Sequence, residues 1–470
     1  MSGSATDKYG WVVVAASFCC MFLNTGINYA VGVLHLGLVE TYPEDEHLVV
    51  WLSSLFGAMF ALSGPVSSLV INFYDCRTCA VAAGVLGMLG FAMSYFVTSL
   101  SWLFVTYGLT VGLGHGLSYS ASTVILGYYF SKDTALAVGI VMTGVGLAMF
   151  VHPPLTSLLM TSYGLRRTFL ILGGITFQSC VFGMLMRPSK YERGRHLVLL
   201  SGRDRRQTVL QIICGGDVTQ FGAITRNIPF VFLLVSVLTF SIALTSLYLF
   251  LPDYFVQSGA SHQVASFTVS MSGIGSVISR IVTGFAANDP QIGCVLLLAG
   301  LVGVSGVVTA CISLFSTTVP GQLTFGFLLG LYTGGVWVVL VPVVIRIIGV
   351  ELLSSGYGLV MLVVGIGCLV GPSLSGLVLK VSDQYVSVFL FCAVLCFTSS
   401  IVCFLTSLPN STRHTESDVH GVETSHHDLH LDKTYLSDNH VCNSDPEQEH
   451  LMLQRRSNIV TVDDQDSDCR

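Results

Sequence analysis

A single arginine inside a long apolar stretch is the residue with the clearest chemical consequence in this sequence. Residues 263–287 contain one formal charge, Arg280, and a helix of that length crosses a bilayer core of roughly 30 Å. Hydroxyl side chains precede the arginine at intervals of four, at Thr268, Ser272 and Ser276, so these side chains share one helical face. Burying a guanidinium in lipid costs at least a few kcal/mol, so this face must meet protein or a wet cavity. We expect Arg280 to hold the carboxylate of an anionic substrate there.

A structural role for Arg280 is the alternative. The residue lies about 10 Å from the C-terminal end of its stretch, at a rise of 1.5 Å per residue. Its long side chain can extend toward that end and pair with a backbone carbonyl. Under this interpretation the arginine supports folding and takes no part in substrate binding.

Polar and aromatic residues in other apolar stretches are candidates for the same cavity. His115 and Tyr119 lie about one helical turn apart, and Asn28 and Tyr29 are neighbours in the first stretch. Each also has a structural interpretation, because buried polar groups need hydrogen-bond partners and aromatic rings pack well between helices. The candidate substrate-binding residues are Arg280, Ser276, Asn28, Tyr29, His115, Tyr119 and Trp337.

The composition is that of a polytopic membrane protein. Of the 470 residues, 52% are hydrophobic and 10% are charged, whereas soluble proteins have about 25% charged residues. The mean hydropathy is +0.73. The 14 cysteines lie mostly inside apolar stretches and form neither a zinc-binding spacing nor a disulfide framework.

The sequence lacks the motifs of several other protein classes. No GxxxxGK(S/T) phosphate-binding loop occurs, which argues against an ATP-driven pump. No Ser–His–Asp arrangement or metal-ligand spacing stands out, so we expect no enzyme activity, no cofactor and no metal site. The basic residues form no field suited to nucleic acid, so we expect no nucleic-acid partner.

Twelve apolar stretches are long enough to cross a membrane as helices. We predict an all-α membrane protein with twelve transmembrane helices in two six-helix halves, residues 1–186 and 229–408. A basic loop, residues 187–228, joins the halves, and an acidic tail, residues 409–470, has a composition that predicts disorder. The stretches are 11–34, 49–73, 79–98, 101–128, 134–160, 168–186, 229–251, 263–287, 291–315, 321–345, 353–379 and 385–408.

The basic residues between the stretches indicate an orientation. With a cytoplasmic N-terminus, 17 Lys and Arg residues fall inside and three, Arg166, Arg167 and Lys380, fall outside. Eight of the 17 lie in the loop 187–228. Because basic residues concentrate in cytoplasmic loops and the number of spans is even, we predict that the loop and both termini are cytoplasmic.

Five longer motifs run through the predicted membrane part. They are YGWVVV at 9–14, YYFSKDTALAVGIVMTGVG at 128–146, YGLRRTFLILGG at 163–174, MRP at 186–188 and ELLSSGYGLVMLVVGIGCLVGPSLSGLV at 351–378. These motifs resemble the monocarboxylate transporter family (solute carrier family 16) of the major facilitator superfamily, and the resemblance extends from Tyr9 to about Leu408. It implies the major facilitator fold, in which two halves enclose a cavity and alternate its access.

The resemblance also implies a substrate-binding arginine on the eighth span, and Arg280 occupies that place. Proton-coupled members of the family add an aspartate one turn before this arginine and a lysine on the first span. Here the first position is Ser276, and the region of Asn28 and Tyr29 contains no lysine. These departures argue against strong proton coupling and against short-chain, lactate-type selectivity.

The predicted function is a secondary-active or facilitative transporter of monocarboxylates or related amphiphilic organic solutes in the plasma membrane, working by alternating access. The alternative is a non-transporting membrane receptor or scaffold that uses its basic loop and acidic tail. Expected partners are the small organic anion or amphiphilic solute, a proton where transport is coupled, and membrane lipid. The resemblance adds a single-span glycoprotein chaperone, because several relatives travel with one.

The predicted orientation can be tested with epitope tags. A tag within residues 190–220, or after residue 409, should bind antibody only after the cells are permeabilised, because both segments are expected in the cytoplasm. A tag in the acidic loop 35–48 is the control and should bind on intact cells. Labelling of the 190–220 tag on intact cells would contradict the orientation.

Overall fold

The computed structural model describes residues 5–130, 132–201, 221–222, 224–289 and 291–406. These residues are helical for most of their length and contain no strand, in agreement with the predicted all-α class. The described helices belong to one compact unit that ends at Leu408. The predicted tail, 409–470, and much of the predicted basic loop lie outside the described residues.

The first half of the bundle extends from α1 to α8. Its spans are broken by short bends, so that one membrane crossing is often built from two or three consecutive helices. The elements are α1 (Ala5–Tyr29), α2 (Val31–Thr41), the 3-10 turn η1 (Pro43–Asp45), α3 (Glu46–Leu62), α4 (Gly64–Phe73), α5 (Cys76–Phe96), α6 (Leu100–Leu103), the π-helical stretch η2 (Phe104–Val111), α7 (Gly112–Tyr129) and α8 (Thr134–Leu185).

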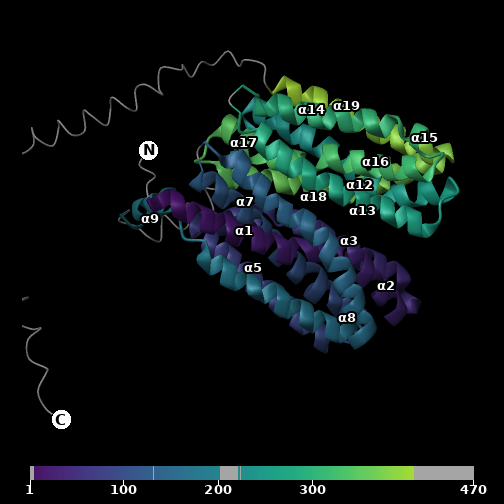
Figure 1. The fold of residues 1–470 in the computed structure, drawn as a ribbon. Coiled ribbons are helices and arrows are strands. Elements are labelled where there is room, and N and C mark those ends of the chain that lie inside the picture. Colours follow the sequence, from purple (N-terminus) through teal and green to yellow (C-terminus); the bar gives the residue numbers. More distant parts are fainter. Residues whose placement is uncertain (1–4, 131, 202–220, 223, 290, 407–470) are drawn as a thin grey trace, which may run out of the picture. The chain divides into compact units, whose positions relative to one another are not determined.

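The second half extends from α12 to α19, and α9 (Lys190–Ser201) lies between the halves in the sequence. Figure 1 shows the helices of the first half, in purple and blue, beside those of the second half, in teal to yellow. The second-half elements are α12 (Ile228–Gln257), α13 (His262–Ala286), α14 (Cys294–Ala310), α15 (Ile312–Phe315), α16 (Val319–Gly334), α17 (Val336–Ile348), α18 (Leu353–Ser382) and α19 (Tyr385–Leu405).

The described helices account for all twelve predicted spans. Nine apolar helices among the described residues are long enough to cross a membrane, and one of these is the 52-residue α8. A helix of that length would measure about 78 Å at 1.5 Å per residue, and it turns at Gly164, whose φ of 78° interrupts the helix. α8 therefore supplies two spans. The series α6–η2–α7 and the pair α14–α15 supply the remaining two.

Side-chain caps explain where several helices begin. Asp75 accepts a hydrogen bond from the Thr78 backbone N–H at the start of α5, at 2.6 Å. Asn227, Ser261 and Thr318 cap α12, α13 and α16 in the same way. Such caps satisfy backbone donors that have no partner inside the helix.

The two halves meet closely where glycines face each other. On α4 and α18, a side chain on Gly64 would collide with the Gly358 carbonyl. On α8 and α13, a side chain on Gly139 would come within 3.0 Å of the Gly284 Cα. Small residues let membrane helices approach to backbone contact, so these crossings hold the halves together without large side chains between them.

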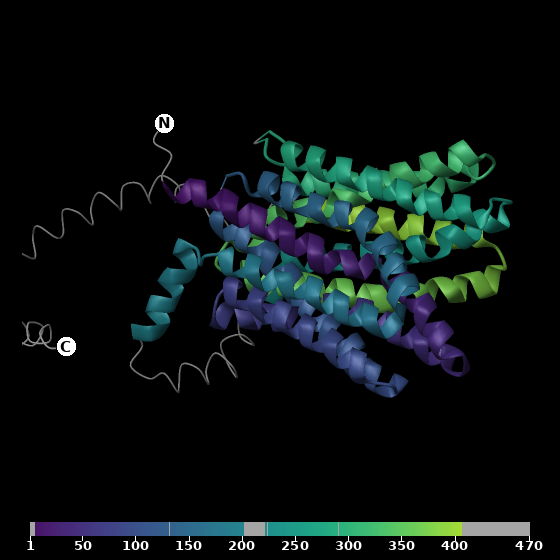
Figure 2. The same cartoon turned by 60° about the horizontal axis from the view of Figure 1, so that its bottom comes forward.

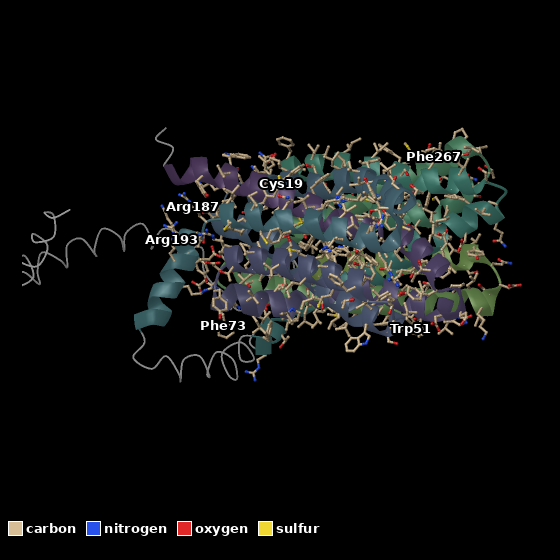
Figure 3. All side chains as sticks on the ribbon, turned by 90° about the horizontal axis from the view of Figure 1, so that it is seen from below. Cys19, Trp51, Phe73, Arg187, Arg193 and Phe267 are labelled. Atoms are coloured by element: carbon tan, nitrogen blue, oxygen red, sulfur yellow. The ribbon has the colours of Figure 1, made fainter. Side chains whose placement is uncertain are left out.

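One end of the bundle carries α9 and is here called the loop end; the opposite end, which carries α2 and α15, is the far end. Figure 2 shows α9 running across the loop end. In Figure 3, Arg187 and Arg193 lie at the loop end, whereas Trp51 and Phe267 lie toward the far end. The described basic residues Arg187 and Arg193 therefore lie at one end of the helices.

The sequence analysis gave no helix to the segment that forms α9. The helix begins with a capping box: the Ser189 hydroxyl accepts from the Glu192 N–H, and the Glu192 carboxylate accepts from the Ser189 N–H at 2.7 Å. The second carboxylate oxygen of this fully buried glutamate accepts from the Cys76 N–H at the start of α5. The spacing Ser189-x-x-Glu192 was the sequence signal for this helix.

Contacts of α9 reach both halves of the bundle. The Arg195 guanidinium donates to the Asn72 side-chain oxygen and to the Ile71 carbonyl at the end of α4. The Tyr191 hydroxyl donates to the Glu351 carbonyl just before α18, at 3.2 Å. Because these partners belong to different halves, α9 adds to the closure of the loop end.

Replacing Arg195 tests the contribution of α9 to stability. Arg195→Ala removes charge-assisted hydrogen bonds worth roughly 1.5–3 kcal/mol each, so the purified protein should unfold at a temperature several degrees lower. Arg193→Ala is the matched control, because the exposed Arg193 guanidinium donates, among the described residues, only to the nearby Pro188 carbonyl. Equal unfolding midpoints for the two variants would show that the Arg195 hydrogen bonds do not stabilise the bundle.

Candidate substrate-binding site

A cavity of about 380 Å³ lies between the two halves of the bundle. The first half contributes residues of α1, α3, α7 and α8, and the second half contributes residues of α12, α13, α16, α17 and α18. The lining residues are Thr25, Tyr29, Phe60, Tyr119, Met142, Val145, Met149, Leu244, Thr245, Tyr248, Val269, Ser276, Arg280, Thr333, Gly334, Trp337, Met361 and Val364.

Arg280 is the charged residue of this lining. Its side chain is 3% exposed, and its Nη1 donates to the Met142 carbonyl of α8 at 2.7 Å. Its buried Nε has no hydrogen-bond partner among the described residues. A guanidinium has five N–H donors, so the bond to Met142 leaves most of them for another acceptor.

The position of Arg280 combines features of both interpretations made from the sequence. The bond to the Met142 carbonyl is the backbone partner that the structural interpretation requires. The place of Arg280 in the cavity wall is what the substrate-binding interpretation requires. The carbonyl belongs to the opposite half, so the guanidinium also bridges the halves. Its role in substrate binding stays a prediction.

The hydroxyl stripe before Arg280 divides into two parts. Thr268 and Ser272 are fully buried, and their hydroxyls bond to carbonyls of their own helix. Gly326 and Gly330 of α16 lie so close to them that an added side chain would collide with the α13 backbone. Of the three hydroxyl residues, Ser276 reaches the cavity lining. Most of the stripe is therefore a close helix–helix contact within the second half.

Tyr29, Tyr119 and Trp337 join Ser276 and Arg280 in the lining, and their part in substrate binding stays a prediction. They come from α1, α7 and α17, which are far apart in the sequence and belong to both halves of the bundle. The Tyr119 hydroxyl lies 3.9 Å from the Met142 sulfur. Tyr119 therefore lies next to Met142, whose carbonyl accepts the hydrogen bond from Arg280.

Asn28 and His115 are not part of the cavity lining. The His115 ring is fully buried between Phe56 and Phe91, with ring-centroid distances of 5.7 and 6.0 Å. Neither ring nitrogen has a hydrogen-bond partner among the described residues, and the same is true of both polar atoms of the Asn28 amide. A part in substrate binding for these two residues stays a prediction that this conformation does not support.

Sequence reasoning missed several lining residues in both halves. Tyr248 on α12 lies in the cavity wall, with its hydroxyl 3.5 Å from the Thr333 hydroxyl. A tyrosine within the apolar stretch 229–251 is a weak signal that could have identified it. Methionines such as Met149 and Met361 gave no signal, because apolar cavity and core residues look alike in a sequence.

Hydrogen bonds join the two halves between the cavity and the loop end. Asn72 of α4 donates to Ser355 of α18 at 2.9 Å, and Asn288 donates to Asp133 at 2.9 Å. All four bonded residues lie nearer to the loop end than the cavity does. Together with the Arg280–Met142 bond, they link the two halves on this side of the cavity.

Comparison with known proteins supports the fold and the motif resemblance. The Major Facilitator Superfamily sequence model matches residues 13–319 and 292–441. The chain is 29% identical over 417 residues to monocarboxylate transporter 12 of Mus musculus, covering 84% of each chain. It is 28% identical over 408 residues to monocarboxylate transporter 4 of Gallus gallus, covering 84% of this chain and 82% of the relative.

The fold is also similar to that of solved transporters. A crystal structure of the E. coli fucose:proton symporter FucP aligns with a TM-score of 0.66 and 13% identity, covering 84% of this chain and 98% of FucP. A structure of FucP in the outward conformation aligns with a TM-score of 0.61 and 12% identity, over the same shares of the two chains. The predicted twelve-helix fold and the resemblance to monocarboxylate transporters are confirmed.

These relatives bear on function only at a coarse level. The curated relatives are named as transporters, which supports a transport protein for small solutes and not an enzyme. The apolar helices and the relatives together support a multi-pass membrane protein.

Proposed function

This chain belongs to the Major Facilitator Superfamily, and we propose from that premise that it carries monocarboxylates or related amphiphilic organic anions across the plasma membrane by alternating access. The observation that carries the proposal is the inter-half cavity with Arg280 in an otherwise uncharged lining. Relatives named monocarboxylate transporters point to the same class of substrate. The alternative of a receptor or scaffold has no observation in its favour.

The proposed anchor for the substrate is the Arg280 guanidinium. A carboxylate can accept two parallel N–H bonds from a guanidinium, which fixes its orientation as well as its position. The buried Nε of Arg280 lacks a partner among the described residues, and a carboxylate that accepts from Nε and one Nη supplies it. The apolar part of the substrate then contacts the uncharged walls.

Substrate binding and opening of the loop end are proposed to be linked through Arg280. The guanidinium bridges the halves through the Met142 carbonyl, and a bound carboxylate competes for its donors and neutralises its charge. A neutralised arginine costs less to move past apolar surface than a free one. The loaded carrier is therefore expected to change conformation more easily than the empty one.

The remaining expectations from the sequence are part of this proposal. The halves 1–186 and 229–408 move relative to each other. The loop end, both termini and the loop 187–228 face the cytoplasm, as the distribution of basic residues favours. A single-span glycoprotein accompanies the carrier to the cell surface.

Substitutions of Arg280 test the proposed anchor. Arg280→Gln should reduce anion uptake per surface molecule by at least about tenfold, equivalent to about 1.4 kcal/mol, because the positive charge is lost. Arg280→Lys keeps the charge but loses the planar fork, so uptake should also fall strongly. Uptake and the amount of carrier at the membrane surface are measured in parallel for each variant.

The structural interpretation of Arg280 makes a different prediction for the same variants. It expects Arg280→Lys to transport normally and Arg280→Gln to lower mainly the amount of folded protein. Normal anion uptake per surface molecule in Arg280→Gln would disprove the proposed anchor.

The pH dependence of uptake tests the absence of strong proton coupling. Ser276 lines the cavity one turn before Arg280, and its hydroxyl neither gains nor loses a proton near neutral pH. Uptake should change less than about threefold between pH 6 and 7.5, roughly 0.7 kcal/mol. A steep acid activation would show that another group carries a proton, and His115→Gln would test whether this buried histidine takes part.

A further inference from the structure

The walls of the cavity differ from what a small hydrophilic acid needs. Five lining residues are aromatic and three are methionines: Tyr29, Phe60, Tyr119, Tyr248, Trp337, Met142, Met149 and Met361. A volume of about 380 Å³ falls in the range of about 300–1,000 Å³ that accommodates drug-sized ligands. A three-carbon acid bound to Arg280 would leave most of this apolar surface in contact with water.

The aromatic residues form two walls that come from different halves. In the first half, the rings of Tyr119 and Phe60 lie edge to face, with centroids 5.1 Å apart. Tyr119 contacts Met142, the residue whose carbonyl accepts from Arg280. The first aromatic wall therefore begins beside the guanidinium.

The second aromatic wall lies on the second half of the bundle. Tyr248 of α12 contacts Thr333 at the end of α16, and Trp337 follows Thr333 by one helical turn, across the junction with α17. All three residues line the cavity. A planar ring held between the two walls would make the offset or edge contacts that aromatic pairs favour.

The charge of the lining restricts the other groups that a substrate can carry. Among the lining residues, all of which are described by the structure, none is acidic. A substrate ammonium would find no carboxylate partner, and it would be repelled by the Arg280 guanidinium at short range. A buried charge without a partner is strongly unfavourable, so the site discriminates against amino acids.

From these observations we propose that the substrates are monocarboxylates with an aromatic body and no cationic group. The carboxylate binds Arg280, and the ring lies between the wall of Tyr119 and Phe60 and the wall of Tyr248 and Trp337. This inference rests on the proposed function, since it names the substrate class of the same cavity.

A matched set of solutes tests the substrate class in vesicles that contain the purified protein. The probes are 3-phenylpropionate, L-phenylalanine, which adds an ammonium group to the same skeleton, 3-phenylpropanamide, which lacks the charge, and lactate, which lacks the ring. Uptake is measured as the initial rate divided by the solute concentration, at concentrations well below saturation. The value for 3-phenylpropionate should exceed that of each other probe by at least about tenfold.

Substitution of one wall residue separates ring recognition from carboxylate recognition. Trp337→Leu should reduce 3-phenylpropionate uptake at least about fivefold and change lactate uptake less than twofold, because the carboxylate anchor is retained. Trp102→Leu is the control, since Trp102 is exposed on α6 and outside the lining, and both uptakes should stay unchanged. Each uptake rate is divided by the amount of that variant in the vesicles, so that differences in folding do not affect the comparison.

The outcomes distinguish this inference from the proposed function. Uptake of lactate that depends on Arg280 and equals or exceeds that of 3-phenylpropionate would overturn the inference and leave the proposed function standing. Equal uptake of L-phenylalanine and 3-phenylpropionate would overturn the exclusion of cationic groups. Absence of uptake for every carboxylate would overturn both.

Discussion

The hydrogen bond from the Arg280 guanidinium to the Met142 carbonyl is the interaction on which the arrangement of the cavity depends. A permanent charge within a membrane span requires a polar partner, and here the partner is a backbone atom of the opposite half. A helical carbonyl has a second lone pair to offer without giving up its own helix. The same bond places the charge in the cavity wall and fastens α13 to α8, so binding and conformation share one group.

The contacts between this bond and the loop end are weak enough to break and form again as the two halves separate and close. The loop end is held in part by hydrogen bonds between uncharged groups, such as Asn72 to Ser355, and by glycine crossings such as Gly64 with Gly358. Each neutral hydrogen bond is worth only about 0.5–1.5 kcal/mol net. In contrast, the seam of Gly326 and Gly330 with α13 lies within one half, where rigidity is needed for the half to move as a body.

Much of the fold could be predicted from the sequence, because lipid imposes simple rules on length and polarity. Twelve apolar stretches were recognisable, and helices of that length satisfy their own backbone hydrogen bonds in lipid. Arg280 could be identified for the same reason, since a lone charge in an apolar stretch requires an explanation. The predicted spans 134–160 and 168–186 also left a break around Gly164, where the structure interrupts α8 at a residue with positive φ.

The candidate site could be predicted only in part, because one helix does not reveal what faces it. Thr268 and Ser276 share a face of α13, yet the first contacts α16 and the second lines the cavity. His115 looks like a cavity residue by type, but its neighbours Phe56 and Phe91 come from α3 and α5 and enclose it. Such outcomes depend on which helices pack together. Arg280 differs from these residues, because its permanent charge cannot be held in an apolar environment. Any helix that faces it must therefore offer a polar partner or a cavity.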